Sequence, residues 1–268
     1  MATERVPFDG LPRAAITGVE SHAGEIVRIE TVSHGFNSEI AARVFTPDSA
    51  FFVKGLRADH RRVWTQHREA EVNPYLRGVA PALLWKVEAA GWVLLGFEAL
   101  EGRHADYSPG SADLPKVGDL LCRLGEVPCP DIDLRRAEQR LESYVAKPAD
   151  VEYFEGESLI HTDLNNENVL VDQRAHLVDW AWASRGAAWL DAAHWVVWLM
   201  AAGRHEPWSA ETWAGRVPAW GTAAPEAIEA FALATANLWE EIAGADPDPW
   251  TAVLLNASRR WAEHRKAL

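Results

Sequence analysis

The segment HTDLNNENVLVDQRAHLVDW, residues 161–180, contains two short apolar runs separated by polar turn-forming residues. The runs VLV and AHLV predict the two strands of a small hairpin. Three oxygen-bearing side chains, Asp163, Asn168 and Asp179, lie at the ends of this hairpin. Each of them alone is typical of a turn or a helix cap. Their combined order, H-x-D-x4-N followed by a hairpin and D-W, indicates a chemical site.

The chemistry that suits these residue types is phosphoryl transfer. This reaction needs positioning and charge neutralisation more than covalent chemistry. Mg²⁺ takes carboxylate and amide oxygens as ligands and keeps several of its waters, so Asn168 and Asp179 can meet one ion. Asp163, on the preceding loop, can orient and deprotonate an attacking hydroxyl. The hairpin then sets the separation between these groups.

Composition restricts the class of protein. The 268 residues are 48% hydrophobic and 24% charged, which is typical of a folded protein with a full core. A net charge of -13 argues against nucleic acid or an anionic membrane as a partner and would suit a cationic substrate. The two cysteines, Cys122 and Cys129, are expected to be free thiols. No signal peptide or membrane-spanning run is predicted, so we expect a cytoplasmic protein, either a monomer or a weak homodimer.

The organisation of the chain predicts an α+β fold with two lobes. In the first hundred residues, three strand-like runs (25–35, 38–46 and 49–55) precede a helix at 61–78, and two more strands follow at 81–91 and 92–100. After a Gly/Pro/Ser-rich connector, helical periodicity covers residues 113–146 and dominates again from Ala187, interrupted by turn-like segments such as PWSAE. The predicted parts are a β-rich N-terminal nucleotide-binding lobe (1–97), a hinge (98–103) and a mainly helical C-terminal lobe (104–268).

The N-terminal lobe holds candidates for nucleotide contacts. Lys54 is the single charge of the strand AFFVKG and could reach phosphates if a carboxylate on the next helix positioned it; Glu69 is suitably placed, with Glu71 as the rival. As an isolated strand lysine it would instead extend into solvent. The turn SHGFNSE could present backbone N–H groups to phosphates through Gly35, Asn37 and Ser38, although it also fits a plain hairpin turn.

The catalytic segment resembles the signature of the aminoglycoside phosphotransferase family, the small-molecule branch of the protein-kinase-like fold. That family usually carries H-G-D-x4-N and a later D after apolar residues. The resemblance extends from about Val32 to Leu199. It implies a bilobal kinase fold that binds ATP or GTP and Mg²⁺ between its lobes. The protein-kinase signatures H-R-D-L and A-P-E are absent, which argues against a protein substrate.

The resemblance also implies residue roles. Asp163 would be the catalytic base with His161 supporting its loop, and Asn168 and Asp179 would be the metal ligands. Asp191 would brace the catalytic loop. The implied nucleotide contacts are Lys54 on the α- and β-phosphates, Glu69 as its partner, and the backbone from Glu98 to Leu100 on the base. Two departures from the family pattern are Thr162 in place of glycine, and Trp180 where protein kinases have phenylalanine.

The acceptor is expected to be a small molecule with a hydroxyl, in first place an aminoglycoside or another sugar-containing antibiotic. A metabolic sugar or amino alcohol is the alternative, and a nucleotide-binding pseudokinase is a second. A metal hydrolase using His161, Asp163, His176 and Asp179 is a poorer hypothesis, because it leaves Asn168 and Lys54 without a role. The side chains considered for acceptor binding are Trp182, Trp208, Trp220, Glu206, Glu211 and Glu240, all of which also fit a helical core or solvated helix faces.

Overall fold

The computed structural model describes residues 5–32 and 38–268. Contacts along the chain divide it into two compact units. The first unit contains the chain up to Gly102 together with Val178–Ala181, and the second contains Arg103–Leu177 and Trp182–Leu268. The short segment that follows the predicted hairpin of residues 161–180 therefore belongs with the N-terminal unit, although it is distant in sequence.

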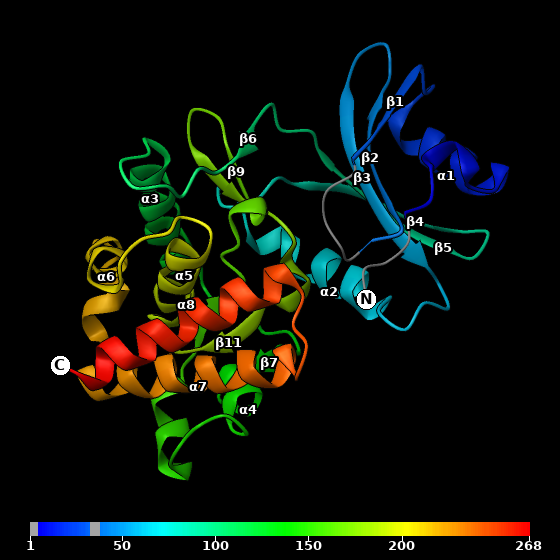
Figure 1. Ribbon diagram of the computed structural model, residues 1–268. Coiled ribbons are helices and arrows are strands. Elements are labelled where there is room, and N and C mark those ends of the chain that lie inside the picture. The colour runs from blue at the N-terminus through cyan, green and yellow to red at the C-terminus, as the bar shows by residue number, and fades with distance from the viewer. Residues whose placement is uncertain (1–4, 33–37) are drawn as a thin grey trace. The chain divides into compact units, whose positions relative to one another are not determined.

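The first unit is built on a five-stranded antiparallel sheet with the order β1-β2-β3-β5-β4 (Figure 1). Its elements are α1 (Arg13–Ala23), β1 (Arg28–Thr31), β2 (Ile40–Phe45), β3 (Ala50–Arg57), α2 (Trp64–Val72), β4 (Leu83–Ala89) and β5 (Trp92–Glu98). The order of strands and helix from β1 to β5 is the one that the sequence predicts. Helix α1 is an addition that the sequence interpretation did not contain.

Alternation along β3 gives the two faces of this sheet different roles. Val53 is fully buried in an apolar cluster with Trp85, Leu94 and residues of α1 such as Val19. Successive side chains of a strand point to opposite faces, so Lys54 lies on the other face, where α2 packs against the strands. The apolar face thus anchors the strand, and the lysine is presented from a rigid element.

The second unit is mainly helical, with two small three-stranded sheets. Its helices are α3 (Asp113–Gly125), α4 (Ala137–Leu141), α5 (Leu190–Ala201), α6 (Pro207–Ala214), α7 (Pro225–Ala243) and α8 (Pro249–Lys266). The sheets have the orders β10-β9-β6 and β7-β11-β8, formed by β6 (Arg103–His104), β7 (Arg135–Arg136), β8 (Ser158–Ile160), β9 (Val169–Val171), β10 (Ala175–Leu177) and β11 (Ser184–Gly186). The hairpin predicted within 161–180 is β9–β10.

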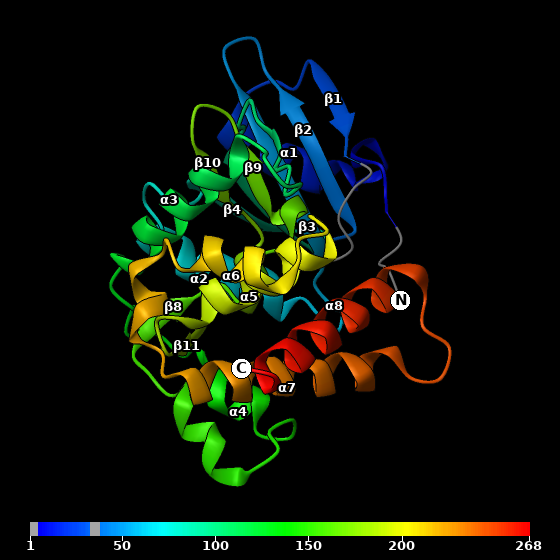
Figure 2. The same ribbon diagram turned by 60° about the vertical axis from the view of Figure 1, so that its left-hand side comes forward.

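Helices α7 and α8 lie side by side in both ribbon views (Figures 1 and 2). The turn between them ends at Asp248, whose carboxylate accepts hydrogen bonds from the backbone N–H groups of Trp250 and Thr251 and so caps α8. Helix α5 packs against α6 and α8 and is buried on nearly all sides, which fits its mainly apolar sequence, LDAAHWVVWLMA. It is therefore a rigid platform for the residues that it carries.

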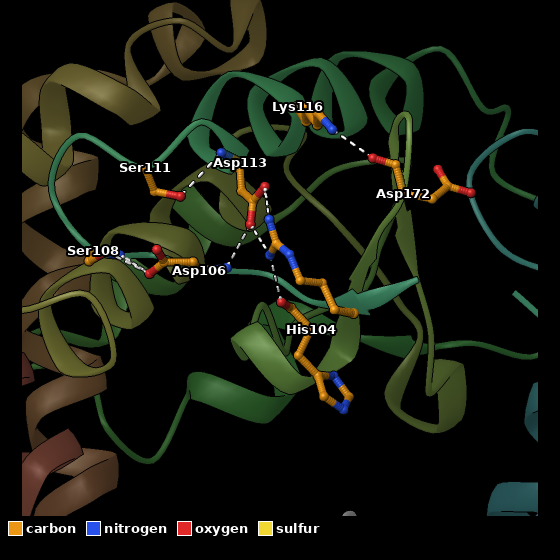
Figure 3. A network of polar contacts seen from close by, with 8 residues as sticks. His104, Asp106, Ser108, Ser111, Asp113, Lys116 and Asp172 are labelled. Atoms are coloured by element: carbon orange, nitrogen blue, oxygen red, sulfur yellow. Dashed lines mark hydrogen bonds and ion pairs between the residues drawn. The ribbon is translucent and has the colours of Figure 1, made fainter. Parts of the chain in front are cut away.

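The connector at the start of the second unit is held by a polar network (Figure 3). Asp113, 1% exposed at the start of α3, accepts hydrogen bonds from the guanidinium of Arg103 and from the backbone N–H of Asp106. Asp106 in turn accepts from the backbone and hydroxyl of Ser108. This network folds the Gly/Pro/Ser-rich segment onto α3, and it leaves β6 in place to pair with β9.

Two sequence-based helix assignments are corrected by the structure. Within the span 113–146 predicted to be helical, Asp113–Gly125 and Ala137–Leu141 are helices, and the chain between them is interrupted because Arg135 and Arg136 pair with β11 instead. The segment PWSAE, expected to be a turn, begins helix α6, with Pro207 at a position where its missing N–H costs nothing. Within the described residues, no helix is long and apolar enough to cross a membrane.

Candidate active site

In the first unit, Lys54 is the centre of a buried ion cluster. Its side chain is 10% exposed and forms ion pairs with Glu69 of α2 and, over 3.1 Å from Nζ to Oδ1, with Asp179. Glu69 is 5% exposed, whereas the side chain of Asp179 is 23% exposed. The pair of Lys54 with Glu69 that the sequence predicts is therefore present. The rival Glu71 is exposed on the same helix.

The electrostatics of this cluster keep the lysine charged. Burial alone would lower the pKa of Lys54, but the charges of Asp179 and Glu69 outweigh burial and raise the pKa above its ordinary value. Burial raises the pKa of Glu69, and this effect is opposed by Lys54 and by a hydrogen bond from the backbone N–H of Trp180. Glu69 thus holds both the lysine and the chain segment that carries Asp179.

The other predicted nucleotide contacts are the turn before β2 and the chain at the end of β5. Gly35 and Asn37 lie outside the described residues, and Ser38, which is buried, accepts a hydrogen bond from Arg5 through its carbonyl oxygen at 2.7 Å. The backbone N–H of Glu98 donates to Ala82, so this N–H serves sheet pairing, and a contact of Glu98 with a base would use its carbonyl oxygen. Leu100 is half-buried beyond the end of β5.

In the second unit, strand β8 leads into the catalytic segment, and α5 fixes the loop that follows. The carboxylate of Asp191 accepts hydrogen bonds from the backbone N–H groups of His161 at 2.8 Å and Thr162 at 2.9 Å. His161 is fully buried, and its Nδ1 accepts a hydrogen bond of 3.2 Å from the backbone N–H of Asp163. These contacts match the bracing roles that the resemblance implies for Asp191 and His161.

Asp163 and Asn168 are in direct contact. Nδ2 of Asn168 donates to Oδ2 of Asp163 at 2.9 Å and to its backbone carbonyl at 3.2 Å. This orients the carboxylate, which is half-buried. Tyr107 also holds the loop, because its hydroxyl donates a hydrogen bond of 3.0 Å to the backbone carbonyl of Leu164. Burial, and secondarily the charge of Asp163, raise the pKa of Tyr107, so it remains a neutral donor.

One of the two departures, Thr162, and the predicted metal ligand Asp179 have unusual backbone. Thr162 has φ of 74° and Asp179 has φ of 64°, in the left-handed region that favours glycine. The glycine that the family usually carries before the catalytic aspartate would adopt this conformation without strain. Here a β-branched residue does so, at a cost of about 1–3 kcal/mol that the surrounding contacts must offset.

The donor chemistry of the predicted metal ligands fits Mg²⁺. In Asn168 the amide nitrogen makes the hydrogen bonds to Asp163, so the amide oxygen is the atom that would bind a metal. Asp179 offers a partly exposed carboxylate. A site with few protein carboxylates is what Mg²⁺ uses when phosphate oxygens and waters complete its shell. Among the described residues there is no cluster of three or more His, Cys, Asp or Glu side chains that could hold a metal by themselves.

The acidic residues considered for acceptor binding are already paired. Glu206 pairs with Arg260, Glu240 with Arg259, and Glu211 with both Arg265 and the indole N–H of Trp261. They serve the packing of α6, α7 and α8. Of the three tryptophans, Trp208 is exposed, whereas Trp182 and Trp220 are half-buried.

One contact of the loop was not expected from sequence. Nη1 of Arg140, from α4, donates to Oγ1 of Thr162 at 2.9 Å and to Oγ of Ser184 at 2.8 Å. An arginine in the charged pattern LRRAEQRLESYVA indicates a solvated helix face, so sequence offers no signal for this contact. Burial and the neighbouring Arg135 lower the pKa of Arg140 to about 10, partly offset by the charges of Asp163 and Asp191.

Comparison with known proteins identifies solved structures that have a similar fold. No family model matches the chain, and no curated protein matches its sequence. Solved structures do match along nearly the whole chain. The choline kinase LicA from Streptococcus pneumoniae has a TM-score of 0.63 at 15% identity, covering 94% of this chain and 98% of the kinase.

Two antibiotic phosphotransferases are also similar in structure. The macrolide 2'-phosphotransferase MphH from Brachybacterium faecium has a TM-score of 0.54 at 16% identity, covering 91% of this chain and 97% of that enzyme. The spectinomycin phosphotransferase APH(9)-Ia, solved with ADP and spectinomycin, has a TM-score of 0.55 at 10% identity and covers 91% and 92%. This chain has the same α+β, protein-kinase-like fold, and the predicted fold class is confirmed.

Proposed function

We propose that this protein transfers the γ-phosphate of ATP or GTP to a hydroxyl group of a small molecule in a Mg²⁺-dependent reaction. The proposal rests mainly on one observation. In each unit, the polar side chains that phosphoryl transfer requires are already in contact with one another. In one unit Lys54 is paired with Glu69 and Asp179; in the other, Asn168 orients Asp163 on a braced loop. The similar solved structures, all named as kinases or phosphotransferases of small molecules, support the same reaction class.

In this reaction each of these residues would have a separate role. Lys54, kept charged by its two carboxylates, would contact the α- and β-phosphates and hold the nucleotide in place. Asp163 would accept the proton of the acceptor hydroxyl as the oxygen attacks phosphorus, with its carboxylate oriented by Asn168. Asn168 and Asp179 would hold Mg²⁺, which supplies charge neutralisation on the phosphates when bound.

For the acceptor, we propose an aminoglycoside or another sugar-containing antibiotic. The similarity to a macrolide and a spectinomycin phosphotransferase supports this class. The similarity to a choline kinase supports an amino alcohol as the alternative acceptor. The net charge of -13 suits an amine-bearing acceptor of either class. A pseudokinase that binds nucleotide without turnover is disfavoured because the polar set is complete.

The test is an acceptor screen read by mass. The purified protein is incubated with Mg²⁺, ATP or GTP and a panel of aminoglycosides, spectinomycin, macrolides, choline and amino sugars, and a product heavier by one phosphate is sought. For an acceptor that reacts, Asp163→Asn is expected to lower kcat by about 10²- to 10⁴-fold with nucleotide affinity retained, because it removes the proton acceptor and keeps the shape. Near-normal turnover by this variant would rule out Asp163 as the base. Nucleotide binding without product from any acceptor would favour the pseudokinase.

A further inference from the structure

Thr162, next to the catalytic aspartate, is held in its left-handed conformation from two sides. On the backbone side, its N–H donates to Asp191. On the side-chain side, its hydroxyl accepts from Nη1 of Arg140 at 2.9 Å and donates to the carbonyl of Trp182 at 3.3 Å. A threonine with φ of 74° carries strain that a glycine would not have. The hydroxyl contacts are specific to this side chain, because glycine at this position could not make them.

Arg140 is itself fixed by its surroundings. Its Nη1 also donates to Ser184, a fully buried residue of β11, and contacts the carbonyl of Trp182 at 3.3 Å. The guanidinium carbon lies 5.6 Å from the centroid of the Trp182 ring, within the range of a cation–π contact. Planar guanidinium donors are rigid compared with a lysine ammonium. Arg140 therefore connects the catalytic loop to β11 and to the residue that follows the segment 178–181.

We propose that Arg140 and Thr162 form a positioning pair that holds the loop in the conformation in which Asp163 can act as the base. The pair contacts the reacting groups only through the loop, so its role is positioning. The proposal rests on the phosphotransfer function proposed above. In this chain a side-chain bridge replaces the conformational freedom of a glycine at the same position.

The first test measures stability and needs no activity. Thr162→Val keeps the β-branch and removes the hydroxyl, Thr162→Ser keeps the hydroxyl, and Arg140→Met keeps the apolar stem of the arginine. The melting temperatures of wild type, the Val and Met single variants and their double variant form a cycle. We expect the Val and Met effects to be non-additive by about 2 °C or more, because both remove the same contact. Additive effects would overturn the bridge.

The second test separates positioning from simple stabilisation. With an acceptor that reacts, Thr162→Val is expected to lower kcat by about tenfold to a hundredfold while the KM for nucleotide stays close to that of wild type. Thr162→Ser is expected to restore kcat. Because Arg140→Met removes a charge from a crowded site and can prevent folding, the Val and Ser pair carries this test alone. The matched control is Arg136→Met. In wild type, the guanidinium of Arg136 pairs with Glu138 and Glu157, which lie outside the loop.

The two failures are distinguishable. If wild type shows no turnover of any acceptor, the proposed function is overturned, and the positioning role with it. If wild type turns over and Thr162→Val retains wild-type kcat at a temperature where it is folded, only the positioning proposal is overturned. A fall in kcat for Thr162→Val that Thr162→Ser does not repair would also overturn it, because the hydroxyl would then not be the responsible group.

Discussion

A single lysine balances two carboxylates in the N-terminal unit. Lys54 and Glu69 are nearly inaccessible to water, whereas Asp179 is partly solvated. Removing one partner of a buried ion pair leaves the other charge without compensation, which costs far more than the pair itself contributes. The ion cluster is therefore a sensitive point of the fold as well as of the proposed chemistry, and the two roles can be measured separately.

Substitution of Lys54 tests this at the residue scale. Lys54→Met is expected to lower the free energy of unfolding by about 3 kcal/mol at pH 7, because Glu69 would remain buried without its cationic partner. Adding Glu69→Gln is expected to recover a substantial part of the loss. Urea unfolding of the wild type, both single variants and the double variant measures this coupling, with the exposed Glu71→Gln as the control for the helix. A loss in the double variant equal to the sum of the two single losses would show that Glu69 and Lys54 are not coupled.

At the scale of elements, helix α5 carries two ionisable side chains whose pKa values are shifted. Burial raises the pKa of Asp191 to about 6, despite the hydrogen bonds from Thr162 and His161. Burial lowers the pKa of His194 to about 3, helped by the charges of Arg140 and His161. The ring of His194 packs edge-on against Phe231 of α7, with 5.0 Å between centroids. The same burial therefore favours the neutral form of both groups.

These shifts predict opposite pH dependences of stability. His194 resists protonation in the folded protein to about pH 3, whereas in the unfolded chain it protonates near 6.5. Its contribution is present at neutral pH and is lost as the pH falls through that window. The stability of wild type relative to His194→Gln should therefore decrease from pH 7 to pH 4.

For Asp191, the unfolded chain ionises at a lower pH than the folded protein. Wild type should therefore lose stability relative to Asp191→Asn as the pH rises from 3.8 to about 6. Chemical denaturation across this range measures both differences, and a pH-independent difference would contradict the shift concerned.

The whole molecule shows which features a sequence can reveal. The succession of strands and helix along the first unit follows from turn residues and alternation. Asp163 and Asn168 are residue types that suit phosphoryl transfer, whereas the roles of Lys54 and Glu69 follow from the combined pattern and the family resemblance. The Arg140–Thr162 contact does not follow, because an arginine among charged residues on a short helix gives no sign of what its guanidinium meets. The membership of 178–181 in the first unit depends on tertiary contacts such as that of Asp179 with Lys54.

The proposed nucleotide and metal contacts predict a stabilisation of the whole protein by ligand. A ligand that binds only the folded state stabilises it by about 2.7 kcal/mol at a hundred times its Kd, which corresponds to a rise in Tm of several degrees for a chain of this size. We expect ATP or GTP with Mg²⁺ to produce such a rise in differential scanning fluorimetry. Because part of it depends on the metal, excess EDTA should reduce the rise.

The contribution of each predicted ligand can then be assigned by substitution. Asp179→Asn and Asn168→Ala are expected to lose most of the Mg²⁺-dependent part of the shift, because the first replaces an anionic carboxylate by a neutral amide and the second removes the amide oxygen. Glu71→Gln should keep the full shift. A fluorimetric titration with Mg²⁺ at fixed nucleotide gives the apparent metal affinity of each variant. If both variants retained the wild-type Mg²⁺ dependence, the assignment of Asn168 and Asp179 as metal ligands would be wrong. The role of Asp163 is tested separately by the turnover of Asp163→Asn.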